Sequence, residues 1–355
     1  MRYGVYVHVP WCRSRCHYCS FNVHVRQDIP WGAYVDAVLR QWDVLRPATA
    51  PATLYLGGGT PSLMPGPHLA RLVRAVGADF TEMEANPEDL GAMSGWPVDR
   101  LSVGAQTFQN AQMAFLNRRH PDLPERLRAV RERFFTWSLD LIFGLPGQGL
   151  ADLDRDLDAL MAAEPPHVSL YGLTAHPGTA FHANVERGRF TLDDHQQADM
   201  FEHIAERLRA SGRPRYEVSN FARPDHRSPH NQLVWSGHPY VGLGAGAHGL
   251  MPDGRRTIGQ PDPQAFIAAP GFSHVEIPSP RQAAVDHLLG AMRHVDGVGV
   301  NDLEKQGFTV DPRRLTPHVR HQTLTLGDRI ALTGRGWLFA DRLIADVATA
   351  LTPLT

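Results

Sequence analysis

Residues 6–21 of the chain read YVHVPWCRSRCHYCSF and contain all three of its cysteines, Cys12, Cys16 and Cys19. The spacing is C-x3-C-x2-C, in a segment that directly follows a short apolar run predicted to be a strand, Gly4–Val9. Three thiolates this close on one loop can converge on one inorganic centre, whereas a closed zinc or cubane iron–sulfur site needs four ligands. The stretch therefore predicts a metal site with one open coordination position, where a substrate or cofactor binds.

Two other interpretations of the cysteines remain open on spacing alone. One of the nearby histidines, His8, His17 or His24, could complete a structural zinc site, or the three thiols could be close together by chance. Zinc ligands usually come as two separated pairs, and no second pair follows, so the spacing favours an open iron–sulfur site. A secreted disulfide scaffold is excluded, because it would carry many cysteines spread along the chain.

The composition is that of an ordinary globular protein. The 355 residues are 43% hydrophobic and 20% charged, with a formal net charge of −2, which suits one large domain plus an appendage. The basic side chains are scattered, so no nucleic-acid partner is expected. No secretory signal pattern and no apolar stretch of about 18 residues occur, so we expect a cytoplasmic protein with reduced thiols and no integral membrane segment.

The first two-thirds of the chain alternates short apolar runs with helical patterns, which is typical of β/α units around a parallel sheet. The expected strands are Gly4–Val9, Thr53–Leu56, Thr81–Met83, Leu101–Val103, Leu139–Phe143 and Val168–Leu170. The expected helices include Ile29–Leu45, Pro67–Val76, Pro124–Phe135 and Asp152–Ala162. The pattern predicts an α/β fold with a partial (β/α)6 barrel, whose function collects on the loops after the strands.

The rest of the chain is expected to be irregular and then helical. Residues 214–239 are rich in His, Asn, Arg and Pro, and the glycine-rich residues 240–250 are expected to be a loop across the barrel mouth. We divide the chain into a barrel domain, residues 1–250, and a small, mainly helical C-terminal domain, residues 251–355.

Residues 6–21 resemble the cluster loop of the radical S-adenosylmethionine (SAM) superfamily. Within it they resemble the oxygen-independent coproporphyrinogen oxidase-like branch, which includes the HemW-type heme chaperones. Further matching segments follow in the family's order: LGGGTPSLM (56–64), EANPEDL (84–90), RLSVGAQTF (100–108), LDLIFGLPGQ (139–148), YEVSNFARP (216–224), HNQLVW (230–235), GLGAGAHG (242–249) and IALTGRGWLFAD (330–341). The resemblance covers almost the whole chain and implies a radical-SAM barrel followed by a HemW-like C-terminal domain.

The resemblance also implies the cofactors and the residues that bind them. Cys12, Cys16 and Cys19 would hold a [4Fe–4S] cluster whose fourth iron chelates SAM, and reductive cleavage of SAM would give a 5′-deoxyadenosyl radical. The positions that match SAM-contacting residues of the family are Tyr6, Tyr18, Gly57, Gly58, Gly59, Thr60, Glu84, Gln106, Arg118, Asp140 and Ala175. Arg118 would pair with the methionyl carboxylate, which suits a planar bidentate donor, although Arg119 is adjacent. A plain turn at the three glycines and a core role for Tyr6 are the structural alternatives.

Heme is the further cofactor that the resemblance implies. His230 and Asn231 lie in a stretch that resembles the HN-x-x-Y-W motif of the branch, and a neutral imidazole can ligate heme iron. His230 is therefore the candidate heme ligand, although His230 and Asn231 could equally hold a loop by hydrogen bonds, and His248 has the same ambiguity. The partners implied are heme, a hemoprotein acceptor, and a reductant such as flavodoxin or ferredoxin.

Departures from the pattern separate two possible functions. Coproporphyrinogen oxidases carry a further cysteine where this chain has Phe21, so porphyrinogen decarboxylation is not expected. The chaperones usually read E-P-G-T where this chain has His176–Thr179, and an aromatic residue where it has Val234. The two functions that remain are a HemW-type heme chaperone, which the whole-chain likeness favours, and a HemN-like C-methyltransferase that uses two SAM molecules on a small molecule.

Overall fold

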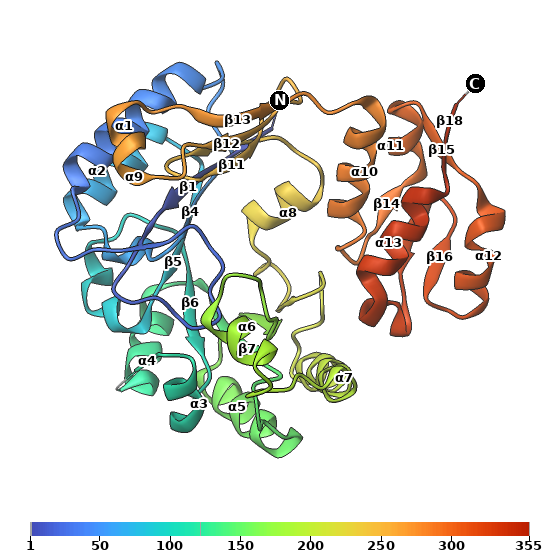
Figure 1. The fold of residues 1–355 in the computed structure, drawn as a ribbon, viewed down its shortest axis with the longest axis horizontal. Helices are drawn as coiled ribbons and strands as arrows, with labels where there is room; N and C mark the ends of the chain where they lie inside the picture. Colours follow the sequence, from blue (N-terminus) through green and yellow to red (C-terminus); the bar gives the residue numbers. More distant parts are fainter. Residues whose placement is uncertain (1, 121, 355) are drawn as a thin grey trace.

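A parallel sheet forms the centre of the protein in the computed structural model, which describes residues 2–120 and 122–354. Six parallel strands lie side by side in chain order (Figure 1): β1 (Gly4–Val9), β4 (Thr53–Gly58), β5 (Phe80–Ala85), β6 (Arg100–Gln106), β7 (Thr136–Phe143) and β8 (His167–Gly172). The helical elements along this part of the chain are α1 (Trp31–Leu45), α2 (Gly66–Val76), η2 (Pro87–Gly95), α3 (Asn110–Phe115), α4 (Leu123–Arg133) and α5 (Leu150–Ala163), followed by α6 (Ala180–Glu186) and α7 (Asp194–Ala210). The predicted partial (β/α)6 barrel and its six strands are confirmed.

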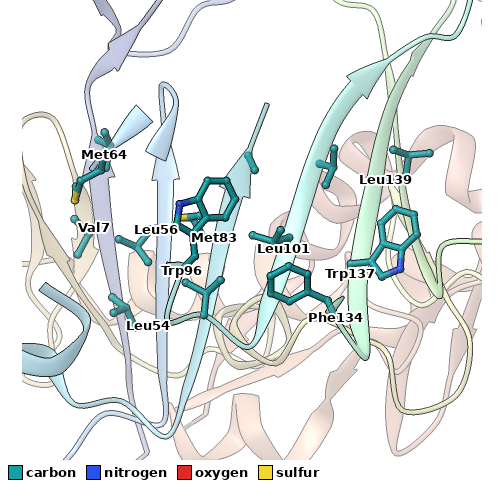
Figure 2. Close-up of a cluster of buried hydrophobic side chains, with 14 of the residues drawn as sticks. Val7, Leu54, Leu56, Met64, Met83, Trp96, Leu101, Phe134, Trp137 and Leu139 are labelled. Atoms are coloured by element: carbon teal, nitrogen blue, oxygen red, sulfur yellow. The ribbon is translucent and has the colours of Figure 1, made fainter. Parts of the chain in front are cut away.

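The strands of the barrel alternate between an apolar outer face and a polar inner face. On β5, Met83 is buried against the core while Glu82 and Glu84 point the other way, and on β7 Leu139 alternates with Asp140. Figure 2 shows the apolar set, with Leu54, Leu56, Met83, Leu101 and Leu139 among its side chains. Strands of a parallel sheet buried on both faces usually read as continuous apolar runs, so the polar alternation shows that the inner face lines something other than core.

The segment expected to be a glycine-rich loop across the barrel mouth instead belongs to the sheet, and that prediction is wrong. Residues 240–243 form β10 (Tyr240–Leu243), which pairs in parallel with β1, and β11 (His248–Leu250) returns antiparallel to it. The sheet continues through β12 (Arg256–Gly259) and β13 (Phe272–Glu276), with α9 (Pro263–Ala268) between them. A Cβ on Gly242 would lie 2.1 Å from the carbonyl oxygen of His248, so this glycine allows two strands to approach rather than marking a loop.

The stretch expected to be irregular also contains regular elements. β9 (Asn220–Ala222) pairs antiparallel with β8, and α8 (Pro229–Trp235) carries the HN stretch. Helix α8 begins at the N-cap Ser228, whose side chain accepts a hydrogen bond from the backbone N–H of Asn231. It packs between the barrel strands β1 and β4 on one side and the C-terminal part of the chain on the other (Figure 1).

The C-terminal part has its own hydrophobic core, which includes Leu288, Ile330 and Ile344. Its helices are α10 (Pro280–Ala291), α11 (Val300–Lys305), α12 (Pro312–Arg320) and α13 (Ala340–Thr349), with η3 (Gly334–Phe339). Two small sheets accompany them, built from β14 (Val298–Gly299), β17 (Arg329–Leu332) and β16 (Leu324–Leu326), and from β15 (Phe308–Val310) and β18 (Leu351–Pro353). The expected helical C-terminal region is confirmed, and because the large sheet runs to Glu276, we propose that the domain boundary lies between β13 and α10 rather than at residue 250.

Within the part of the chain that the structure describes, we find no helix with both the length and the apolar character needed to cross a membrane.

Candidate cofactor site

A cavity of ≈ 490 Å³ lies inside the barrel, bordered by the cysteine loop, the inner faces of the strands and α8. Most of the residues predicted from the sequence line it together: Cys12, Cys16, Tyr18, Cys19, Gly58, Gly59, Thr60, Glu84, Gln106, Arg118 and Asp140. They come from six separate segments of the chain, so the fold brings the motifs to one place. Tyr6, Gly57, Ala175 and His230 are not among the lining residues.

The cysteine loop is held at both ends by short strands. β2 (Trp11–Cys12) pairs with β3 (His24–Val25), and Trp11, 1% exposed, packs edge-on against Tyr34 at 4.7 Å. Within the loop the backbone N–H of Cys19 donates to the carbonyl oxygen of Cys16 at 3.2 Å. All three thiols are free and half-buried on the cavity wall.

The donor set of this wall, three thiols and no fourth cysteine, fits a thiolate-bound iron–sulfur cluster that the protein leaves one ligand short. Burial raises the pKa of Cys12 and of Cys19, so metal binding would release protons from these thiols. His8 is unsuited to complete a zinc site, because its Nδ1 lies 2.9 Å from the hydroxyl of Tyr6 and its Nε2 lies 2.9 Å from the carbonyl oxygen of Asn22. Over residues 2–120 and 122–354, no three His, Cys, Asp or Glu side chains are arranged to hold one metal ion.

The glycines after β4 allow the chain to pass close beneath the cysteine loop. Gly58 has φ +114°, and a Cβ on it would lie 2.6 Å from the ring of His8, while a Cβ on Gly59 would lie 2.7 Å from the carbonyl oxygen of Trp11. The backbone N–H of Gly59 donates to Val9 at 2.8 Å and that of Gly58 donates to Glu84 at 3.1 Å. These two N–H groups are therefore used within the protein. Beside them, the hydroxyl of Thr60, just before η1 (Pro61–Leu63), donates to the sulfur of Cys12 at 3.4 Å.

Two carboxylates line the cavity, Glu84 on β5 and Asp140 on β7. Glu84 accepts hydrogen bonds from the hydroxyl of Tyr55 at 2.9 Å and from Gly58, and Asp140 accepts one from Ser102 at 2.8 Å and one from Ser138 at 2.9 Å. Burial raises the pKa of Glu84 to about 7, with a further rise from Asp140. Burial likewise raises the pKa of Asp140, against serine hydroxyls that lower it. Both groups can accept hydrogen bonds from a cationic or hydroxylated ligand.

Arg118, in the segment after α3, lines the same cavity as these carboxylates. Its Nη1 donates to the side-chain oxygen of Asn86 at 2.6 Å, while its buried Nε has no partner among the described residues. Burial opposes its charge, but Tyr18 and Cys16 raise the pKa of Arg118, so the guanidinium stays charged. A charged guanidinium on a residue that lines the cavity suits a ligand carboxylate. Arg119 is exposed and does not line the cavity, so the structure separates the two arginines.

Gln106 reaches the cavity because β6 is irregular at its end. The pairing of β6 with β7 shifts between Gly104 and Gln106, and Gln106 has φ +71°. A Cβ on Gly104 would lie 2.7 Å from Nε2 of Gln106, so the glycine leaves space for this side chain.

Tyr6 and Ala175 lie in other surroundings than those expected of ligand-contacting residues. The ring of Tyr6 stacks on Tyr55 at 6.2 Å, and its hydroxyl pairs with His8. Ala175 is half-buried and packs against a small apolar cluster that includes Leu173 and Phe181. For both residues SAM contact stays a prediction from the resemblance.

His230 is enclosed by the barrel wall. It is 4% exposed, its Nδ1 lies 2.9 Å from the hydroxyl of Thr53, and its ring centroid lies 5.2 Å from that of Tyr55. Burial lowers the pKa of His230 to about 4. These contacts are those of the structural alternative, in which the HN stretch holds a segment in place, and heme ligation by His230 remains a prediction. Asn231 does line the cavity, and His248 is exposed.

The sequence reasoning missed two polar residues at the opposite end of the cavity, Arg100 and His167. Arg100 forms a buried ion pair with Glu82 at 3.0 Å, and His167 bonds to Ser138 and to Tyr216. Polar residues alternate with apolar ones along β5, β6 and β7. This alternation could have indicated that the strands have a polar inner face, but it does not show which ligand that face binds.

Comparison with known proteins agrees with the motifs. The sequence profile of the radical SAM superfamily matches residues 6–160. The heme chaperone HemW of Bacillus subtilis is 33% identical over 335 residues, covering 87% of this chain and 88% of that protein. HemW of Escherichia coli is 35% identical, covering 74% of this chain and 75% of its own. The solved structure of coproporphyrinogen III oxidase (HemN) from Escherichia coli, a radical SAM enzyme, superposes with a TM-score of 0.81 at 20% identity and covers 98% of this chain and 90% of its own, which shows the shared fold.

Proposed function

The chain belongs to the HemW family of the radical SAM superfamily, and on this premise we propose that it is a heme chaperone that binds heme next to a SAM-loaded iron–sulfur cluster and delivers it to a hemoprotein. The observation that carries the proposal is the similarity to HemW over most of both chains. Phe21 stands where coproporphyrinogen oxidases have a further cysteine, which supports a function other than porphyrinogen decarboxylation.

Cys12, Cys16 and Cys19 would hold the [4Fe–4S] cluster at the cavity wall. When bound, the cluster supplies one electron for the reductive cleavage of SAM. The half-buried position of the cysteine loop, at the surface of the barrel, supports access by a small reductant protein such as flavodoxin or ferredoxin.

The other lining residues would bind SAM by matching its charges. Arg118, held by Asn86 and charged, would pair with the methionyl carboxylate. Glu84 and Asp140 would accept hydrogen bonds from the methionyl ammonium and the ribose hydroxyls, and a cationic ligand would favour the ionised form of Glu84. Gly58 and Gly59 let the chain pass close to His8 and Trp11, which places Thr60 beside the cysteine loop at this wall.

The experiment is a heme titration of the anaerobically reconstituted protein, with and without SAM, followed by the Soret band. We expect saturable binding of about one heme per chain. The matched control is the variant with Cys12, Cys16 and Cys19 all replaced by Ala, which should lose iron and sulfide. Full retention of iron and sulfide in that variant would contradict the cluster assignment, and no heme binding at micromolar concentration would contradict the chaperone function.

The lining of the cavity by Arg100 and His167 supports a second candidate, a radical SAM enzyme that acts on a small molecule, such as a C-methyltransferase that uses two SAM molecules. Arg100 and His167 line the cavity beyond the residues that match SAM contacts. Incubation with dithionite and SAM distinguishes the two functions. Rapid release of 5′-deoxyadenosine together with S-adenosylhomocysteine, in the presence of a small-molecule substrate, would favour the enzyme.

A further inference from the structure

Some residues line the cavity and are also largely exposed to solvent, and these form what we call the cavity mouth. Two segments, the cysteine loop and the chain from the end of β8 onward, supply its large side chains: Arg15, Phe21, Tyr171 and His176. The two segments lie together, because the backbone N–H of Phe181, in α6, donates to the carbonyl oxygen of His17 at 2.9 Å. Tyr18 and Ala175 also pack against the same small apolar cluster. The cavity mouth is therefore built by both segments.

Two aromatic residues at the cavity mouth keep a large accessible surface. Phe21 is 64% exposed and Tyr171 is 45% exposed, although both line the cavity. Burying aromatic surface is favourable, so rings that stay open beside a cavity mark a place where a ligand binds better than they mark packing. The flat faces of such rings suit a flat, apolar ring system.

His176 is the accessible histidine of this cavity. Of the described residues, His167 and His176 are the two histidines that line it. His167 is 1% exposed, and its ring nitrogens lie 2.8 Å from the hydroxyls of Ser138 and Tyr216, so both are used. His176 is exposed, and its ring forms no hydrogen bond or ion pair with the described residues. Its backbone is fixed, because its carbonyl oxygen accepts a hydrogen bond from the hydroxyl of Thr179 at 2.7 Å.

The donors at the cavity mouth fit the three chemical parts of heme. A neutral imidazole such as that of His176 can ligate heme iron, and the rings of Phe21 and Tyr171 can contact the macrocycle. Arg15 is exposed, and its side chain forms no ion pair with the described residues, so its guanidinium can pair with a propionate. By contrast His230, the other candidate ligand, is 4% exposed and does not line the cavity.

We propose that His176 is the axial ligand of heme in this chain, with the macrocycle against Phe21 and Tyr171 and a propionate on Arg15. The proposal rests on the heme-chaperone function and adds to it the residue that binds the iron. A cavity of ≈ 490 Å³ is in the lower part of the range for small-molecule sites. With SAM inside it, the heme is held at the cavity mouth and stays partly in solvent. Such a position suits a chaperone, because its heme must be released to another protein.

The test is a titration of the reconstituted, SAM-loaded protein with ferric heme at pH 8, followed by the Soret band and by electron paramagnetic resonance of the iron. His176→Ala should bind heme about tenfold more weakly, with a displaced Soret maximum and unchanged iron–sulfur content. In His176→Gly, added imidazole should restore the wild-type Soret maximum, which a merely structural role of His176 would not produce. The exposed His321→Ala in the C-terminal part is the matched control and should behave as wild type.

Heme dimethyl ester, which lacks the two carboxylates, tests the contact with Arg15. Wild type should bind heme about tenfold more tightly than the ester, and Arg15→Gln should remove this preference, whereas the exposed control Arg320→Gln should keep it. Equal affinity of wild type for the two hemes would overturn the contact with Arg15.

The outcomes separate the ligand from the function. A wild-type affinity and Soret maximum in His176→Ala, or no effect of imidazole on His176→Gly, would overturn the assignment of His176 and leave the chaperone function standing. Failure of the wild-type protein to bind heme would contradict the chaperone function and, with it, the assignment.

Discussion

Glu84 gives the protein a stability that depends on pH, and the substitution Glu84→Gln should remove that dependence. Burial raises the pKa of Glu84 from 4.5 to about 7 in the folded protein. Since the folded state holds this proton more tightly than the unfolded state, its stability is greatest at low pH and falls as pH rises through about 7. Glu84 therefore lowers the free energy of unfolding at neutral and alkaline pH.

The size of the effect follows from the pKa. Ionising Glu84 in the folded protein costs about 3 kcal/mol at pH 8, and about 2 kcal/mol of this cost arises between pH 5.5 and pH 8. Glutamine cannot ionise, but its amide has one oxygen to offer, whereas Glu84 accepts from Tyr55 with one oxygen and from Gly58 with the other. Loss of one hydrogen-bond acceptor in Glu84→Gln lowers the unfolding free energy by about 1–3 kcal/mol. Because this loss does not change with pH, it can be told apart from the cost of ionising Glu84.

The assay is urea unfolding of the metal-free, reduced protein at pH 5.5 and at pH 8, for wild type and Glu84→Gln. We expect wild type to lose about 2 kcal/mol more than the variant between the two pH values. Other titrating groups, such as Glu217, whose pKa burial also raises to about 7, cancel in this comparison because both proteins carry them. Equal pH dependence in the two proteins would refute the reasoning, whatever their absolute stabilities.

Three further substitutions test other parts of the site. Gly58→Ala places a Cβ against the ring of His8 at a positive φ, so we expect a loss of about 1–3 kcal/mol in unfolding free energy, and lower iron content after reconstitution; unchanged values in both would contradict the close approach. Arg118→Lys should weaken SAM binding about tenfold in equilibrium dialysis without loss of iron, because lysine lacks the two parallel N–H donors of a guanidinium. Wild-type affinity for SAM would argue against a contact between Arg118 and the methionyl carboxylate. His230→Ala should lower the unfolding free energy by about 2–4 kcal/mol, measured by urea, as expected for a buried ring with a hydrogen bond, whereas a stable variant that has lost heme binding would support a ligand role instead.

The sequence predicted the barrel well, because its strands carry local signals. Each of the six runs is short, apolar and followed by glycine or a polar loop, so the period and the boundaries can be read without knowing the fold. The prediction of a loop over residues 240–250 was wrong because the local signal there was misleading. Gly242 occurs in a strand only because the carbonyl of His248 lies against it, and that is a contact between segments that no local pattern contains.

The candidate site divides in the same way. Cys12, Cys16 and Cys19 lie within one loop, so their spacing alone indicated a shared centre. Arg100 and Glu82 are on different strands, and their pairing depends on the register of β5 against β6, in which they are direct partners. Residue types can show that such strands have a polar face, but only the register shows which charges meet.

The same register explains why the HN stretch serves the barrel before it serves any ligand. Glu82 accepts hydrogen bonds from Arg100, from Ser228, which is the N-cap of α8, and from His230 in its first turn. Without Arg100, Glu82 would be a buried charge held only by neutral donors, which is costly, and the helix start that it fixes would lose its anchor. The pair of Glu82 and Arg100 thus holds the start of α8, which carries Asn231 on the cavity wall, so loss of Arg100 should disturb the HN stretch as well as β6.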